Sequence, residues 1–99
     1  MPDDARPLLV FFTSDRSGPG RRMESLLAHL ARKERTRLRV TRVDVDRRAD
    51  LAQRFHVRTV PTLALVKEKR VVDRLEGRAS APQIERMLEP HLARLPSLA

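Results

Sequence analysis

Hydrophobic residues first form a continuous run and then recur at helical spacing. Residues 8–12 read LLVFF, an apolar run of strand length that is typical of a strand buried on both faces. Ser17 and Pro19 follow, a hydroxyl that can cap free N–H groups and a proline suited to a first helical turn. One apolar helical face then comes from Met23, Leu26, Leu27, Leu30 and Ala31. The chain is therefore predicted to open with a strand and a helix.

The middle of the chain predicts two more strands around a short helix. The second strand is marked by Leu38, Val40, Val43 and Val45, and the inner face of the short helix by Leu51, Ala52 and Phe55. Asp46 is placed to cap that helix. Residues 59–66, TVPTLALV, carry the third strand, with Pro61 at its entry, where a missing N–H does least harm.

The last third predicts a hairpin and a closing helix. A tight turn at Glu68 and Lys69 leads into an antiparallel fourth strand over residues 70–76, which Gly77 ends. Ser80 and Gln83 fit a capping box for the helix that follows. Its buried stripe is Ile84, Met87, Leu88, Leu92 and Leu95, and Pro90 predicts a kink or an early end.

The element order is β-α-β-α-β-β-α, an α/β fold with a four-stranded mixed sheet and helices on both faces. Two right-handed crossovers predict that the first three strands are parallel, with the hairpin adding an antiparallel edge. We expect one domain over residues 1–99, with residues 1–7 as an N-terminal extension and residues 95–99 as a frayed tail.

Composition adds a strong positive charge. The formal net charge is +8, and only Lys33, Lys67 and Lys69 among the 21 basic residues are lysine. Asn, Tyr, Trp and Cys are absent and Ile84 is the single isoleucine, a skew that fits a GC-rich genome as well as a functional demand. A net charge of this size can still steer encounters with acidic partners.

The absence of cysteine excludes several kinds of chemistry. These 99 residues can form no disulfide, thiolate nucleophile or cysteine-based metal site. His29, His56 and His91 lack the spacing of metal ligands, so no metal and no cofactor is expected. The first residues are acidic where a secretory signal would be basic, and no membrane span is visible, which makes the cytoplasm the expected location.

Five segments in this order resemble the thioredoxin family. They are LLVFF at residues 8–12, SGPGRRM at 17–23, VDVD at 43–46, LAQRFHVRTVPTLALV at 51–66, and Gly77. The match covers residues 8–93, nearly the whole chain, but the family's usual first strand and helix are missing. The resemblance implies a shortened thioredoxin-like fold, with Val60–Pro61 as a cis peptide bond.

The chain departs from the family at the residues that carry its chemistry. Ser17 and Gly20 stand in place of both active cysteines, and Arg16 replaces the tryptophan before them. Phe11 replaces the buried aspartate that assists proton transfer, and Arg42 lies where the family often has a lysine. Thiol–disulfide exchange needs a thiolate, which a serine hydroxyl cannot supply. We therefore expect a redox-inactive member that is not an enzyme, with Ser17, Gly18, Pro19 and Gly20 as a degenerate motif.

The resemblance also implies a peptide groove, in which an extended segment pairs with backbone as an added strand. Carried over, its residues are Arg16, Ser17, Gly18, Pro19, Thr59, Val60, Pro61 and Gly77. The expected function is a protein-binding or scaffolding module. The simpler interpretation is that Gly18 and Pro19 only start a helix and that Pro61 only shapes a turn.

Two alternatives of other classes stay open. Ser17 at a helix N-terminus resembles the serine that holds a glutathione thiolate in some transferases of this fold, which suggests a thiol-ligand site. The basic stretch ARKERTRLR at residues 31–39 suggests binding to an acidic protein or to nucleic acid. Nucleic acid is the less expected ligand, because the only aromatics, Phe11, Phe12 and Phe55, lie in apolar contexts. The oligomeric state is open.

Overall fold

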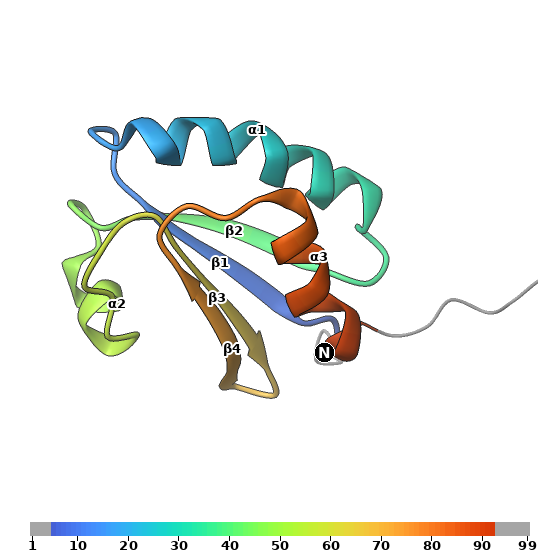
Figure 1. Ribbon diagram of the computed structural model, residues 1–99. Helices are drawn as coiled ribbons and strands as arrows, with labels where there is room; N and C mark the ends of the chain where they lie inside the picture. Colours follow the sequence, from blue (N-terminus) through green and yellow to red (C-terminus); the bar gives the residue numbers. More distant parts are fainter. Residues whose placement is uncertain (1–4, 93–99) are drawn as a thin grey trace, which may run out of the picture.

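The computed structural model describes residues 5–92, which form one four-stranded sheet with helices on both faces (Figure 1). The elements follow the predicted order. They are β1 (Leu8–Thr13), α1 (Gly18–Lys33), β2 (Arg39–Asp44), α2 (Ala49–Arg54), β3 (Thr62–Lys67), β4 (Arg70–Glu76), α3 (Ala81–Leu88) and a 3-10 turn, η1 (Glu89–His91).

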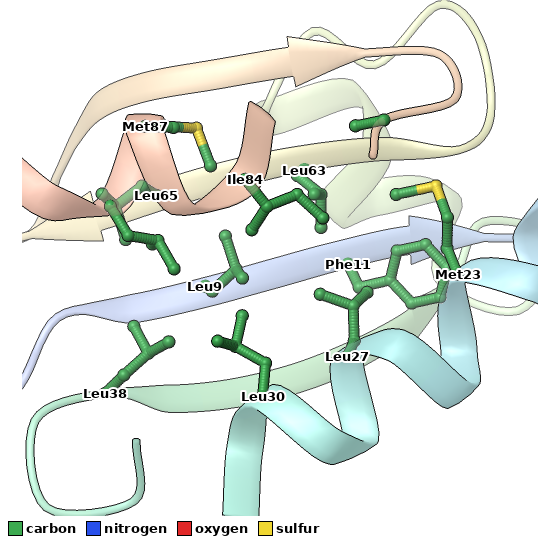
Figure 2. Close-up of a cluster of buried hydrophobic side chains, with 12 residues drawn as sticks. Leu9, Phe11, Met23, Leu27, Leu30, Leu38, Leu63, Leu65, Ile84 and Met87 are labelled. Carbon is green, nitrogen blue, oxygen red and sulfur yellow. The ribbon is translucent and has the colours of Figure 1, made fainter. Parts of the chain in front are cut away.

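The first face of the sheet carries the larger core, beneath α1 and α3 (Figure 2). Successive side chains of a strand point to opposite faces, so Leu9 and Phe11 of β1 both lie on this side. The core gathers the buried apolar residues of both helices and of the central strands. Its members are Leu9, Phe11, Met23, Leu27, Leu30, Leu38, Leu63, Leu65, Ala79, Ile84, Met87 and Leu88.

The second face carries a smaller core, and α2 lies on this side. Val10, Phe12, Val43 and Ala64 are its buried members, with Leu51 and Phe55 of α2 packed against them. The rings of Phe12 and Phe55 lie 5.1 Å apart between centroids, within the range of favourable aromatic pairs. Arg74 of β4 donates to the carbonyls of Phe55 and His56 at 2.8 and 3.2 Å, which fixes the end of α2.

Local signals placed most helix ends correctly. Ser17 is the N-cap of α1, and Ser80 and Gln83 form the predicted capping box of α3. Helix α3 ends at Leu88, just before Pro90, and the chain continues as η1. The prediction for Asp46 is wrong, because the N-cap of α2 is Arg48 and no side chain caps it. Asp46 instead accepts a hydrogen bond from the hydroxyl of Ser14 at 2.7 Å.

The predicted direction of the third strand is also wrong. The sheet order is β2-β1-β3-β4, and β3 pairs antiparallel with β1, so only β1 and β2 are parallel. A parallel return needs a crossover that runs the length of the sheet. The six residues of α2 span only about 9 Å, whereas a six-residue strand spans about 20 Å. The chain therefore enters β3 at the end of the sheet where β2 finished.

The predicted frayed tail, residues 95–99, lies outside the described residues, as does Leu95 of the predicted stripe. Leu92 follows η1 and packs against the larger core as a half-buried residue. Within residues 5–92, no helix combines the length and apolar character needed to cross a membrane.

Candidate functional site

The antiparallel entry of β3 brings the predicted site residues to one end of the sheet. At this end Thr13 of β1 is opposite Asp44 of β2, Phe12 is opposite Thr62 of β3, and Thr62 is opposite Glu76 of β4. Four chain segments leave or enter the sheet here: those after β1, β2 and β4, and the one before β3. We call residues 16–19, 59–61 and 77 the three-loop surface, and it contains all eight residues predicted for the peptide groove.

The first loop is held by Ser17. Its hydroxyl oxygen accepts a hydrogen bond from the backbone N–H of Gly20 at 3.0 Å, and its own N–H donates to the Ser14 carbonyl at 2.9 Å. Pro19 lies in the first turn of α1, where backbone N–H groups have no intrahelical acceptor, so its lack of an N–H removes no helical hydrogen bond. The degenerate motif thus retains the local geometry of a helix start, and the Ser17 oxygen serves as its cap.

Gly20 lies in close contact with the end of β1. A Cβ atom at Gly20 would lie 2.3 Å from Oγ1 of Thr13 and 3.1 Å from Oγ of Ser17. Thr13 is itself buried, with 1% of its surface exposed. Residue 20 can therefore carry no side chain unless Thr13 or the helix start moves. No pattern in the sequence predicts this contact, because Thr13 and Gly20 are brought together only by the turn between them.

The second loop presents an extended backbone. The Val60–Pro61 bond is cis, which confirms the implication of the resemblance. The Thr62 hydroxyl donates to the Thr59 carbonyl at 2.8 Å, and the Pro61 carbonyl accepts from the N–H of Gly77 at 2.7 Å. Among the described residues, none makes a hydrogen bond with Val60. Its N–H and C=O are therefore free to pair with a ligand backbone.

The third loop turns at Gly77, immediately after β4. Gly77 has a φ of +81°, in the left-handed region that favours glycine, which explains why β4 ends here as predicted. A Cβ atom at Gly77 would meet nothing within 4 Å, and the same holds for Gly18. Open space therefore lies beside both glycines of the three-loop surface.

Arg42 of β2 lies beside the first loop, with its charge neutralised. Its Nε–H donates to Glu24 of α1, and its Nη2–H donates to Asp15 at 3.0 Å. The hydrogen bond to Glu24, with a further contribution from Asp15, raises the pKa of the Arg42 guanidinium above its ordinary value. Phe11 is opposite Arg42 in the strand register and is buried. The position of the family's buried carboxylate is thus apolar in this chain.

The remaining candidates are scattered over the molecule. His29 and His56 are exposed and His91 is half-buried, and residues 5–92 contain no cluster of histidine and carboxylate side chains that could hold a metal ion. The basic stretch at residues 31–39 spans the end of α1 and the start of β2, far from the three-loop surface. Four of its five basic residues, Arg32, Lys33, Arg35 and Arg39, are exposed, and Arg37 is half-buried and paired with Glu34.

Comparison with known proteins assigns the family. The thioredoxin family model matches residues 2–90. The chain belongs to the thioredoxin family. A thioredoxin-like protein of Synechocystis is 30% identical over 84 residues, which cover 85% of this chain and 80% of the relative. A thioredoxin of Mycobacterium tuberculosis is 35% identical over 72 residues, covering 73% and 62% of the two chains.

Solved structures confirm the thioredoxin-like fold. The germline-specific thioredoxin Deadhead of Drosophila melanogaster superposes with a TM-score of 0.83 at 28% identity, covering 89% of this chain and 83% of that one. A thioredoxin mutant of Halobacterium salinarum gives a TM-score of 0.83 at 30% identity, with 94% and 80% of the two chains covered.

This member of the family has no residue that could carry the family's thiol chemistry. Family members are oxidoreductases, and their reaction passes through an attacking thiolate. No cysteine occurs anywhere in these 99 residues, so the chain supplies no thiolate of its own. What the thioredoxin fold retains here is the arrangement of the three loops, including the cis bond before Pro61 and the turn at Gly77.

Proposed function

We propose that this chain is a non-catalytic thioredoxin that binds an extended polypeptide segment at the three-loop surface, as a protein-binding or scaffolding module. The observation that carries the proposal is the backbone of Val60, which makes no hydrogen bond to any other described residue. The backbone of an extended segment beside Val60 would accept one hydrogen bond from the Val60 N–H and donate one to the Val60 C=O, as in strand addition.

The surroundings of Val60 support this proposal. A 2.7 Å backbone hydrogen bond fixes Gly77 beside Pro61. No other atom lies within 4 Å of the position that a Cβ atom would take at Gly77 or at Gly18. A peptide backbone can therefore approach without a side chain in its path. The replacement of both cysteines removes the reaction but leaves these features unchanged, since none of them involves sulfur.

The proposal predicts that a bulky side chain at residue 18 weakens peptide binding. Short unstructured peptides would be selected on the wild-type chain from a display library and measured by calorimetry. We expect Gly18→Trp to weaken the selected peptides at least tenfold, about 1.4 kcal/mol, because the indole would occupy the open space beside the first loop. The left-handed backbone strain that would complicate a change at Gly77 does not arise at Gly18.

Gly18→Ala is the matched control. Like Gly18→Trp, it replaces glycine by a residue with a Cβ atom, but it adds no large side chain. The Cβ meets nothing within 4 Å, so peptide affinity should stay within twofold of wild type. Equal affinity of the wild type and Gly18→Trp for every selected peptide would contradict the proposed function.

A further inference from the structure

Three arginines at the proposed peptide site have no ionic partner within residues 5–92. Arg16 begins the first loop, Arg58 directly precedes the second, and Arg78 directly follows the third. All three are exposed, and no ion pair or hydrogen bond joins any of their guanidinium groups to another described residue; the backbone N–H of Arg16 donates to the Ser14 hydroxyl at 3.3 Å. Each loop therefore carries or adjoins one guanidinium without a partner in the described part of the chain.

The acidic residues nearest to these loops are already engaged. Asp15 binds Arg42 at 3.0 Å, and Glu76 binds Arg74 at 3.3 Å. Asp46, just after β2, accepts a hydrogen bond from the Ser14 hydroxyl at 2.7 Å and so lies beside the first loop, whereas β1 separates β2 from β3 and β4 in the sheet order. Within residues 5–92, the charged groups that adjoin the second and third loops without an ion-pair partner are therefore Arg58 and Arg78.

The position of these three arginines, rather than their lack of a partner, distinguishes them. Arg42, Arg48 and Arg74 form ion pairs with carboxylates, but exposed arginines elsewhere within residues 5–92, such as Arg22, Arg54 and Arg70, form none. Arg16, Arg58 and Arg78 each adjoin a different loop of the three-loop surface. Guanidinium groups on the rim of a binding surface increase the rate of encounter with acidic ligands and discriminate against basic ones.

We propose that the extended segment bound at the three-loop surface is acidic, with glutamate or aspartate side chains that face Arg16, Arg58 and Arg78. This inference rests on the proposed function, since it names the class of peptide that the same site takes. The backbone pairing at Val60 supplies the alignment, and the three guanidinium groups supply the selectivity.

The test compares two capped peptides by fluorescence anisotropy, one with alternating Glu and Thr and one with alternating Gln and Thr. We expect the Glu peptide to bind the wild-type chain about tenfold more tightly than the Gln peptide at low salt. The difference should shrink as salt is raised, because exposed charges are screened.

Two triple variants distinguish an effect of the arginines at the site from an effect of the net charge of the chain. The first combines Arg16→Gln, Arg58→Gln and Arg78→Gln. The control removes three exposed arginines remote from the site, through Arg32→Gln, Arg70→Gln and Arg86→Gln, so both proteins lose the same charge. We expect the first triple variant to bind the Glu peptide about tenfold more weakly than wild type and the control to stay within twofold.

Each contrary result has a distinct meaning. Equal binding of the Gln and Glu peptides, both blocked by Gly18→Trp, would overturn the acidic preference and leave the proposed function standing. Equal weakening by the two triple variants would assign the preference to overall charge and also overturn it. A single-stranded oligonucleotide that displaces the Glu peptide and binds more tightly would overturn it in favour of nucleic acid. Binding that Gly18→Trp leaves unchanged would remove the proposed function itself.

Discussion

Phe11→Asp is expected to lower the free energy of unfolding by at least about 4 kcal/mol at neutral pH. The substitution removes a phenyl ring that is 2% exposed in the larger core, which alone costs about 3–5 kcal/mol. It also places a carboxyl group among Leu9, Leu27 and Leu63. Because small domains are stable by only about 5–15 kcal/mol, the variant should be largely unfolded in mild urea, as circular dichroism would show.

The pH dependence identifies the buried carboxyl as the cause. Burial raises the pKa of a carboxyl in the folded state above its unfolded value near 4, so the folded state binds more protons. Stability relative to wild type should therefore fall as pH rises from about 4 toward 7. Phe11→Leu is the uncharged control, with a loss below about 2 kcal/mol and no pH dependence. A pH-independent deficit in Phe11→Asp would show that the carboxyl reaches water.

Gly20→Ala is expected to destabilise the chain by up to about 2 kcal/mol, although alanine favours a helix interior. The new Cβ would lie 2.3 Å from Oγ1 of buried Thr13, so the threonine or the helix start must move. That cost exceeds the gain of about 1 kcal/mol that alanine brings over glycine in a helix. Urea unfolding of the purified variant measures the difference.

A double-mutant cycle with Thr13→Ala checks the mechanism. Removing Oγ1 eliminates the collision, so Gly20→Ala should cost at least 1 kcal/mol less in the Thr13→Ala background than alone. Additive losses would mean that the collision is not the cause. The same contact applies to Gly20→Cys, so restoring the family's second thiol requires a change at Thr13 as well.

Local patterns predicted the order of the elements and most of their ends. The apolar run before Thr13, the cap at Ser17 and the capping box at Ser80 and Gln83 each act within a few residues, so the sequence displays them directly. The direction of β3 depends instead on whether α2 is long enough to cross the sheet. The apolar spacing around Leu51 did not reveal that length, and the parallel arrangement was therefore predicted wrongly.

The place of the candidate site residues in the fold was predictable, but their interactions were not. The segments of the thioredoxin motifs placed Ser17, Pro61 and Gly77, and the structure brings them to one end of the sheet. Which arginines are free could not be read from a chain with arginine in nearly every element. The structure shows that Asp15 and Glu76 bind Arg42 and Arg74, which leaves Arg58 and Arg78 without an ion-pair partner within residues 5–92.

The most direct test of the central claim is amide hydrogen exchange at Val60, measured by NMR with and without a saturating peptide from the selected set. Strand addition at the three-loop surface predicts that exchange at Val60 slows at least tenfold on binding, because its free N–H becomes hydrogen-bonded. The N–H of Gly20, already bound to Ser17, should change little. A bound peptide that leaves exchange at Val60 unchanged would contradict the account, since the ligand would then lie elsewhere on the molecule.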